Sequence, residues 1–139
     1  MEQFIMLNTQ TKTITISDIR YTVDEIINEK DEYIRMEAAE QYFALSQLIN
    51  DRSFLVRAAV ARNKIGLEQL ADDENWRVRA IVAKYCDNEA TINKLINDEN
   101  DFVRFTILKR GFGLQKLSND PDDEIASIAR YEIQKSQAA

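Results

Sequence analysis

The stretch LINDENDFVR, residues 95–104, decides the fold because the chain contains it in five versions. The other four are IINEKDEYIR (26–35), LINDRSFLVR (48–57), LADDENWRVR (70–79) and LSNDPDDEIA (117–126). The ninth position is apolar in every version, and we refer to these residues as the anchors: Ile34, Val56, Val78, Val103 and Ile125. Their spacings are 22, 22, 25 and 22 residues. Regular self-similarity at such a period predicts a chain built from stacked repeats.

Each repeat predicts two short helices. TINKLIN (91–97) and GLEQLAD (66–72) belong to the first helix, and VRAAVAR (56–62) and VRAIVAK (78–84) belong to the second. The second helix carries apolar residues at positions i, i+3 and i+4, which form an amphipathic stripe. All three glycines fall where one repeat joins the next, and glycine relieves left-handed strain at helix ends: Gly66, Gly111 and Gly113.

Two joints depart from this plan. No glycine follows the second helix of the first repeat, so EAAEQYFALSQLIN (37–50) is compatible with one long helix. The three extra residues of the 25-residue spacing fall within residues 85–90, and insertions of this kind are tolerated in loops.

Residues 1–20 lie outside the repeats. FIML (4–7) and TKTITIS (11–17) are rich in β-branched residues and predict a small hairpin with Asn8–Gln10 as its turn. We therefore divide the single domain into a hairpin over residues 1–20 and a helical repeat region over residues 21–139. The hairpin either covers the open apolar end of the first repeat or offers a strand edge to a partner, and stacked repeats need covered ends.

Composition excludes many kinds of chemistry. The 139 residues suggest one domain, and no apolar run approaches the roughly 20 residues of a membrane span. The N-terminus lacks the features of a signal peptide, and a single cysteine, Cys86, predicts a reducing cytoplasm. The absence of histidine excludes histidine-based catalytic dyads and triads and His-ligated metals, while one cysteine excludes Cys-rich metal sites. We expect no enzyme activity, catalytic residue, cofactor or metal.

The pattern L-x-x-D-x-x-x-x-V-R, followed by small and aliphatic residues, resembles the HEAT-like repeats of armadillo-type α-solenoids. The short period is nearest to their leucine-rich-variant subtype, and the resemblance covers about residues 22–134. It implies an all-α fold, a short right-handed α-α superhelix of about five helix pairs. Family members with short repeats are mostly scaffolds and binding modules, and one branch, the alkylpurine DNA glycosylases, binds DNA. The last repeat departs from the pattern, because Ala126 stands where the others have arginine.

Two charged residues recur with the anchors. An aspartate lies five residues before four of the anchors, where we expect it to cap the second helix: Asp51, Asp73, Asp98 and Asp120. The first repeat has Glu29 at this position. An arginine follows four anchors: Arg35, Arg57, Arg79 and Arg104. These arginines either form an anion-binding stripe or pair with the aspartates as a structural ladder, and the sequence favours the ladder. In the resembling family this pair is a structural feature.

A second basic series comes five residues after three of these arginines, at Arg62, Lys84 and Lys109, and Arg110 is paired with Lys109. Five helical residues turn about 500°, which places this series roughly 140° around the helix from the first. It is either solvated charge near helix C-termini or a binding surface. Fourteen of the 24 acidic residues lie in the turns within repeats, where stacking would collect them in an acidic rim. The sequence DPDDEIASIARYE (120–132) lacks the glycine and glutamate of a calcium loop.

An aromatic residue also precedes four anchors, and packing between repeats is the simplest explanation: Tyr33, Phe54, Trp76 and Phe102. Aromatic side chains that remain exposed beside an acidic rim would anchor a protein partner. Trp76 with the adjacent Arg77 is the first pair to test. Cys86 has no basic neighbour except Lys84 and is expected to be a bystander thiol.

These observations favour a non-catalytic protein-binding module, which could be an adaptor, a scaffold or an inhibitor. It would use the concave face formed by the second helices and the charged rims, and its partner would be another protein. The alternative is a nucleic-acid-binding protein that uses the second basic series.

Overall fold

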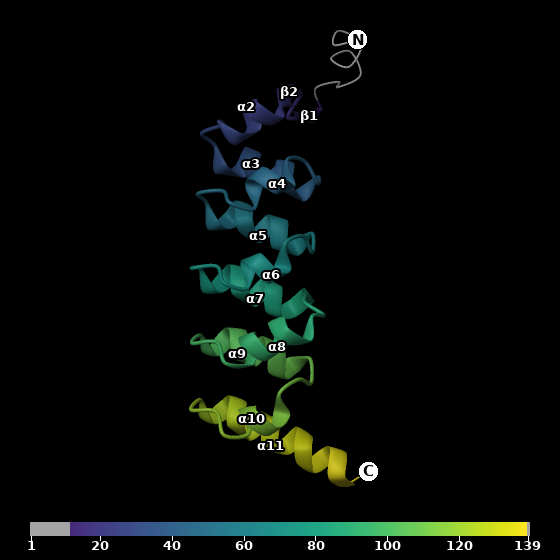
Figure 1. Ribbon diagram of the computed structural model, residues 1–139, viewed down its shortest axis with the longest axis vertical. Coiled ribbons are helices and arrows are strands. Elements are labelled where there is room, and N and C mark those ends of the chain that lie inside the picture. The colour runs from purple at the N-terminus through teal and green to yellow at the C-terminus, as the bar shows by residue number, and fades with distance from the viewer. Residues whose placement is uncertain (1–11, 139) are drawn as a thin grey trace. The chain divides into compact units, whose positions relative to one another are not determined.

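The computed structural model of the protein describes residues 12–138, and Figure 1 shows the order of the elements along the chain. This part of the chain contains ten helices and one two-stranded sheet, so the prediction of a mostly helical chain with a small hairpin is confirmed. It divides into two compact units between Asn63 and Lys64. None of its helices has the length and apolar character needed to cross a bilayer.

The first unit contains β1 (Thr13–Ile16), β2 (Ile19–Thr22), α2 (Val23–Ile27), α3 (Glu32–Glu40), α4 (Leu45–Leu48) and α5 (Phe54–Arg62). The second unit contains α6 (Leu67–Leu70), α7 (Trp76–Tyr85), α8 (Glu89–Ile96), α9 (Asp101–Lys109), α10 (Leu114–Leu117) and α11 (Asp123–Ala138). Helix α3 packs against α5 in the first unit, while α7 packs against α9 and α10 against α11 in the second.

The hairpin has a different partner strand from the one we predicted. Strand β1 pairs with β2 in antiparallel register, with Ile16 opposite Ile19. Ser17 and Asp18 form the turn with φ values of 50° and 67°, and two successive positive φ values are typical of a type I′ hairpin. The predicted strand at residues 4–7 lies outside the described residues. Strand β2 crosses the boundary that we placed after residue 20, because the chain passes directly from this strand into α2.

The second helices of four repeats begin at short polar residues whose side chains accept a backbone N–H of the first turn. These N-caps are Asp31, Ser53, Asn75 and Asn100. The first helix α2 begins with a capping box in which Thr22 and Glu25 each accept the other's backbone N–H. Local sequence therefore defines where these helices start.

The prediction that residues 37–50 could form one long helix is wrong. Helix α3 ends at Glu40, and the chain turns through Tyr42 and Ala44, whose φ values are 62° and 55°. Gly111 and Gly113 form the same kind of turn, with φ values of 86° and 68°. A tyrosine and an alanine thus adopt the left-handed conformation that glycine accepts more easily, which is why the absence of glycine hid this turn.

The anchors occupy the core, with one exception. Val56, Val78 and Val103 are fully buried and Ile125 is almost so, whereas Ile34 is only half-buried. The three extra residues lie at the predicted joint, where α7 continues to Tyr85 and Asn88 caps the eight-residue helix α8.

Candidate protein-interaction surface

Three of the arginines that follow the anchors, Arg35, Arg79 and Arg104, pair with an aspartate of the next repeat. Nε and Nη2 of Arg35 donate to the two carboxylate oxygens of Asp51 at 2.9 and 3.1 Å. Arg79 contacts Asp98 in the same way at 2.8 and 3.1 Å, and Arg104 contacts Asp120 at 2.7 and 3.0 Å. Each of these bidentate pairs joins a second helix to the turn within the following repeat.

The remaining guanidinium nitrogen, Nη1, binds the turn of the arginine's own repeat. In four repeats it donates to a backbone carbonyl six residues earlier, and the acceptors are Glu29, Asp51, Asp73 and Asp98. Distances lie between 2.6 Å for the Arg35 contact and 2.8 Å for the Arg104 contact. Arg57 therefore shares this local contact with the other three arginines.

The aspartates do not cap the second helices, so that prediction is wrong. Oδ1 of each aspartate accepts the backbone N–H two residues later at 2.9 Å, as in an Asx turn, and the four donors are Ser53, Asn75, Asn100 and Asp122. The first three donors are themselves N-caps. The aspartate thus orients the residue that caps the helix. Its own carboxylate accepts an N–H of the turn and not an N–H of the helix.

Electrostatics fit this structural role. The hydrogen bonds that Arg79 donates to Asp98 raise the pKa of Arg79 above its ordinary value, and those that Arg104 donates to Asp120 do the same for Arg104. Burial alone would raise the pKa of Asp120, but hydrogen bonds from Arg104 and the Asp122 N–H hold it below its ordinary value. These guanidinium groups are already paired with carboxylates of the chain itself. This pairing argues against the alternative in which the arginines bind external anions.

The second basic series divides into residues with different environments. Arg110 is tied inward, because Nη1 donates to the carbonyl oxygens of Ala83 and Cys86 at 2.8 and 2.7 Å. Arg62 is half-exposed and lies 3.6 Å from Glu40 in the first unit. Lys84 and Lys109 are exposed beside rings of their own helices, at 5.4 Å from Tyr85 and 6.0 Å from Phe105.

An aromatic patch lies on α7 and α9 and consists of Trp76, Phe102 and Phe105. The Trp76 and Phe102 rings meet edge to face with centroids 5.7 Å apart, and the Phe102 and Phe105 centroids are 6.4 Å apart. Phe102 is 52% exposed, so packing does not account for the whole of its surface. The Arg77 guanidinium lies 4.6 Å from the Trp76 centroid. Sequence reasoning missed Phe105, although its i+3 spacing from Phe102 on a helix was a usable signal.

The aromatic patch borders a groove between the N-terminal turns of α9 and α11, which we call the α9–α11 groove. Its volume is about 260 Å³. The lining residues are Asp101, Phe102, Phe105, Asp122, Glu124 and Ile125. The lining therefore combines apolar side chains with three carboxylates and contains no basic residue.

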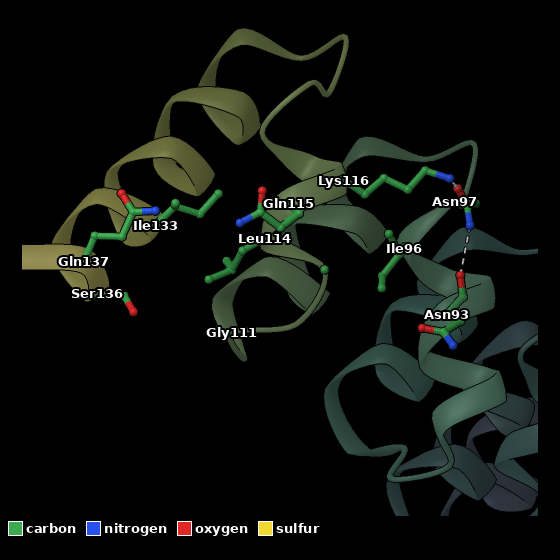
Figure 2. A pocket seen from close by; sticks show the side chains of 11 residues that line it. Asn93, Ile96, Asn97, Gly111, Leu114, Gln115, Lys116, Ile133, Ser136 and Gln137 are labelled. Carbon is green, nitrogen blue, oxygen red and sulfur yellow. Dashed lines mark hydrogen bonds between the residues drawn. The ribbon is translucent and has the colours of Figure 1, made fainter.

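A larger hollow lies elsewhere in the second unit, among α8, α10 and the end of α11 (Figure 2). Its volume is about 670 Å³. In Figure 2, Ile133 and Gln137 of α11 lie on the opposite side of this hollow from Ile96, the last residue of α8, and Asn97, which caps it. Lys116, the only charged residue in the lining, hydrogen-bonds to Asn97. This hollow contains no cluster of catalytic or metal-binding groups.

The other two predicted aromatic residues do not belong to the second unit. Tyr33 is exposed and Phe54 is half-buried, and both belong to the first unit. Cys86 is buried, and burial raises the pKa of its thiol more than the neighbouring Arg110 lowers it. Within residues 12–138, no three acidic or cysteine side chains are grouped so that they could hold a metal ion.

Comparisons of the chain with known protein families, with curated proteins and with solved structures find no match. Function must therefore be argued from the surface itself. The aromatic patch and the α9–α11 groove form the surface best suited to recognise another molecule.

Proposed function

We propose that this chain is a non-catalytic protein-binding module, acting as an adaptor, scaffold or inhibitor. The aromatic patch is the observation that supports the proposal most strongly. Aromatic residues are enriched among the side chains that dominate binding energy at protein interfaces, and a half-exposed cluster bordered by charge has the composition of such a site. Trp76 and Arg77, which the sequence singled out, lie in or directly beside it.

The proposal includes the architecture that the sequence suggests, a short HEAT-like α-solenoid. It is supported by repetition, because the same arginine–aspartate geometry occurs around Arg35 in the first unit and around Arg79 and Arg104 in the second. Four of the five anchors are buried, and three arginine–aspartate pairs join consecutive repeats within the units. A HEAT-like α-solenoid offers an extended partner a long surface to bind. The single buried thiol fits a reducing cytoplasm.

Nucleic acid is the less favoured partner. Arg110 is occupied by backbone carbonyls, and Arg62 has an acidic neighbour in Glu40. A net charge of −6 further opposes binding to a phosphate backbone. Lys84 and Lys109 remain exposed, so the experiment includes a direct test of this alternative.

The test uses the full chain immobilised for affinity capture from cell extract, in parallel with electrophoretic shift assays on duplex and single-stranded nucleic acid across a range of salt. We expect a protein that is retained by the native chain and lost from the variant Trp76→Ala/Phe102→Ala. Tyr131→Ala is the control, because Tyr131 is also exposed but lies outside the aromatic patch. Steeply salt-dependent binding to nucleic acid that Lys84→Glu/Lys109→Glu abolishes, with no protein retained, would refute the proposal.

A further inference from the structure

We propose that the α9–α11 groove binds a basic peptide segment, in which an apolar side chain enters the groove and a flanking lysine or arginine meets its carboxylates. This inference rests on the proposed function and specifies the chemistry of the partner. It is drawn from the charge, exposure and dimensions of the groove.

The apolar part of the groove is suited to one side chain. Among its apolar lining residues, Phe102 is 52% exposed, Phe105 is half-buried and Ile125 is only 2% exposed. The volume of about 260 Å³ is smaller than the pockets that enclose a drug-sized ligand. A groove of this size instead resembles the pockets into which single anchor side chains insert at protein interfaces.

The acidic part of the groove is open to an external cation. Asp101 and Glu124 are exposed, and within the described part of the chain neither carboxylate forms a hydrogen bond or ion pair, although Asp101 interacts electrostatically with Arg104. Asp122 differs, because its Oδ1 already accepts the Ile125 N–H at 3.0 Å. Two carboxylates thus remain available beside an apolar surface.

The rings themselves give a second argument for a cationic partner. Trp76 and Phe105 each have a cation of the chain nearby, Arg77 at 4.6 Å and Lys109 at 6.0 Å from the ring centroids. No cation of residues 12–138 lies over Phe102, the central and most exposed ring of the aromatic patch. A lysine or arginine that approached Asp101 would lie close enough to contact this ring by a cation–π interaction.

Charge also argues against two other ligands of the α9–α11 groove, a second copy of the chain and nucleic acid. A second copy of the chain carries the same net charge of −6, so self-association at an acidic groove would bring like charges together. Nucleic acid would place phosphates against Asp101, Asp122 and Glu124. A basic partner is attracted by the local charge and by the chain as a whole, and this attraction makes association fast and salt-sensitive.

The test selects peptides from a phage-displayed library of random 12-residue sequences on the immobilised full chain. We expect the enriched peptides to combine an aromatic or aliphatic residue with an excess of lysine and arginine. Synthetic versions of these peptides are then titrated, and the fluorescence of Trp76 reports binding, since it is the only tryptophan and its ring contacts Phe102. Affinity should fall at least tenfold in Phe102→Ser and about threefold to tenfold in Asp101→Asn/Glu124→Gln.

Two variants serve as matched controls that should leave the affinity unchanged. Glu89→Gln removes an exposed carboxylate from the first turn of α8, where its relation to the helix matches that of Asp101 and Glu124. Tyr131→Ser removes an exposed ring of α11 outside the groove. Circular dichroism of each variant verifies that it is folded.

Three results would overturn the inference: no enrichment, enriched peptides without an excess of basic residues, or binding that the groove variants leave unchanged. None of these alone overturns the proposed function, because affinity capture tests that separately. A protein retained through the aromatic patch, together with failure of the peptide prediction, would show that the module binds a partner of different chemistry.

Discussion

Gly111 and Gly113 provide a matched pair for testing how the joint between α9 and α10 is built. Both adopt left-handed backbone conformations, with φ values of 86° and 68°. They differ in the space around them. A Cβ atom at Gly111 would have no neighbour within 4 Å, whereas one at Gly113 would lie 2.7 Å from Cδ1 and 2.8 Å from Cγ1 of Ile96.

This difference predicts different losses of stability on substitution by alanine. Gly111→Ala should lower the free energy of unfolding by about 1–2 kcal/mol, the cost of a left-handed L-residue. Gly113→Ala carries the same cost and also forces a buried isoleucine to move, and overpacking of a core typically costs about 1–3 kcal/mol. We therefore expect Gly113→Ala to lose about 2–5 kcal/mol in total.

Equilibrium unfolding in urea, followed by circular dichroism, measures both values. A double-mutant cycle isolates the contact: in an Ile96→Ala background the substitution Gly113→Ala should cost only about as much as Gly111→Ala, because the obstructing side chain is gone. Equal losses for the two glycine variants in the native background would contradict the reasoning. So would a loss at Gly113 that Ile96→Ala leaves unchanged.

Three further predictions concern other parts of the chain. Ala44→Gly should raise the free energy of unfolding by about 1 kcal/mol, because Ala44 holds a φ of 55° that glycine adopts without strain; a lower urea midpoint would contradict this. The free energy of unfolding should fall as the pH drops below about 4, because the pKa of Asp120 is lower in the folded state and the unfolded state therefore binds a proton first. Acid titrations followed by circular dichroism should show a weaker pH dependence in Asp120→Asn. The Cys86 thiol should react with Ellman's reagent at pH 8 much more slowly in the folded than in the urea-unfolded chain, because it is buried and its pKa is raised; equal rates would show that the joint opens freely.

The repeat pattern carried most of the information about local structure. The anchors identified the second helices, and the polar residues before them supplied N-caps at Ser53, Asn75 and Asn100. The positions of the breaks were predictable only where glycine marked them. The turn through Tyr42 and Ala44 lies between buried residues of α3 and α4, and the intrinsic preference of these two residues does not predict it.

The roles of the charged residues required the structure. The sequence placed an aspartate in four of the five turns and an arginine on four of the five second helices, and both of the roles it suggested for the arginine were chemically reasonable. Only the distances show that Arg104 binds Asp120 with both oxygens, and that Asp120 supports the following turn instead of capping the helix. Likewise, Phe105 and Glu124 are far apart in sequence and become one groove only when α9 and α11 lie together.

What the sequence by itself determined is the periodic part of this protein: which residues are apolar, where helices start, and at which positions the charged residues recur. These properties depend on residues a few positions apart, which interact through the backbone geometry of a single helix or turn. The tertiary structure alone decided which side chains hold the repeats together and which remain exposed. That division depends on contacts between residues 16 or more positions apart, which exist only after the helices have packed.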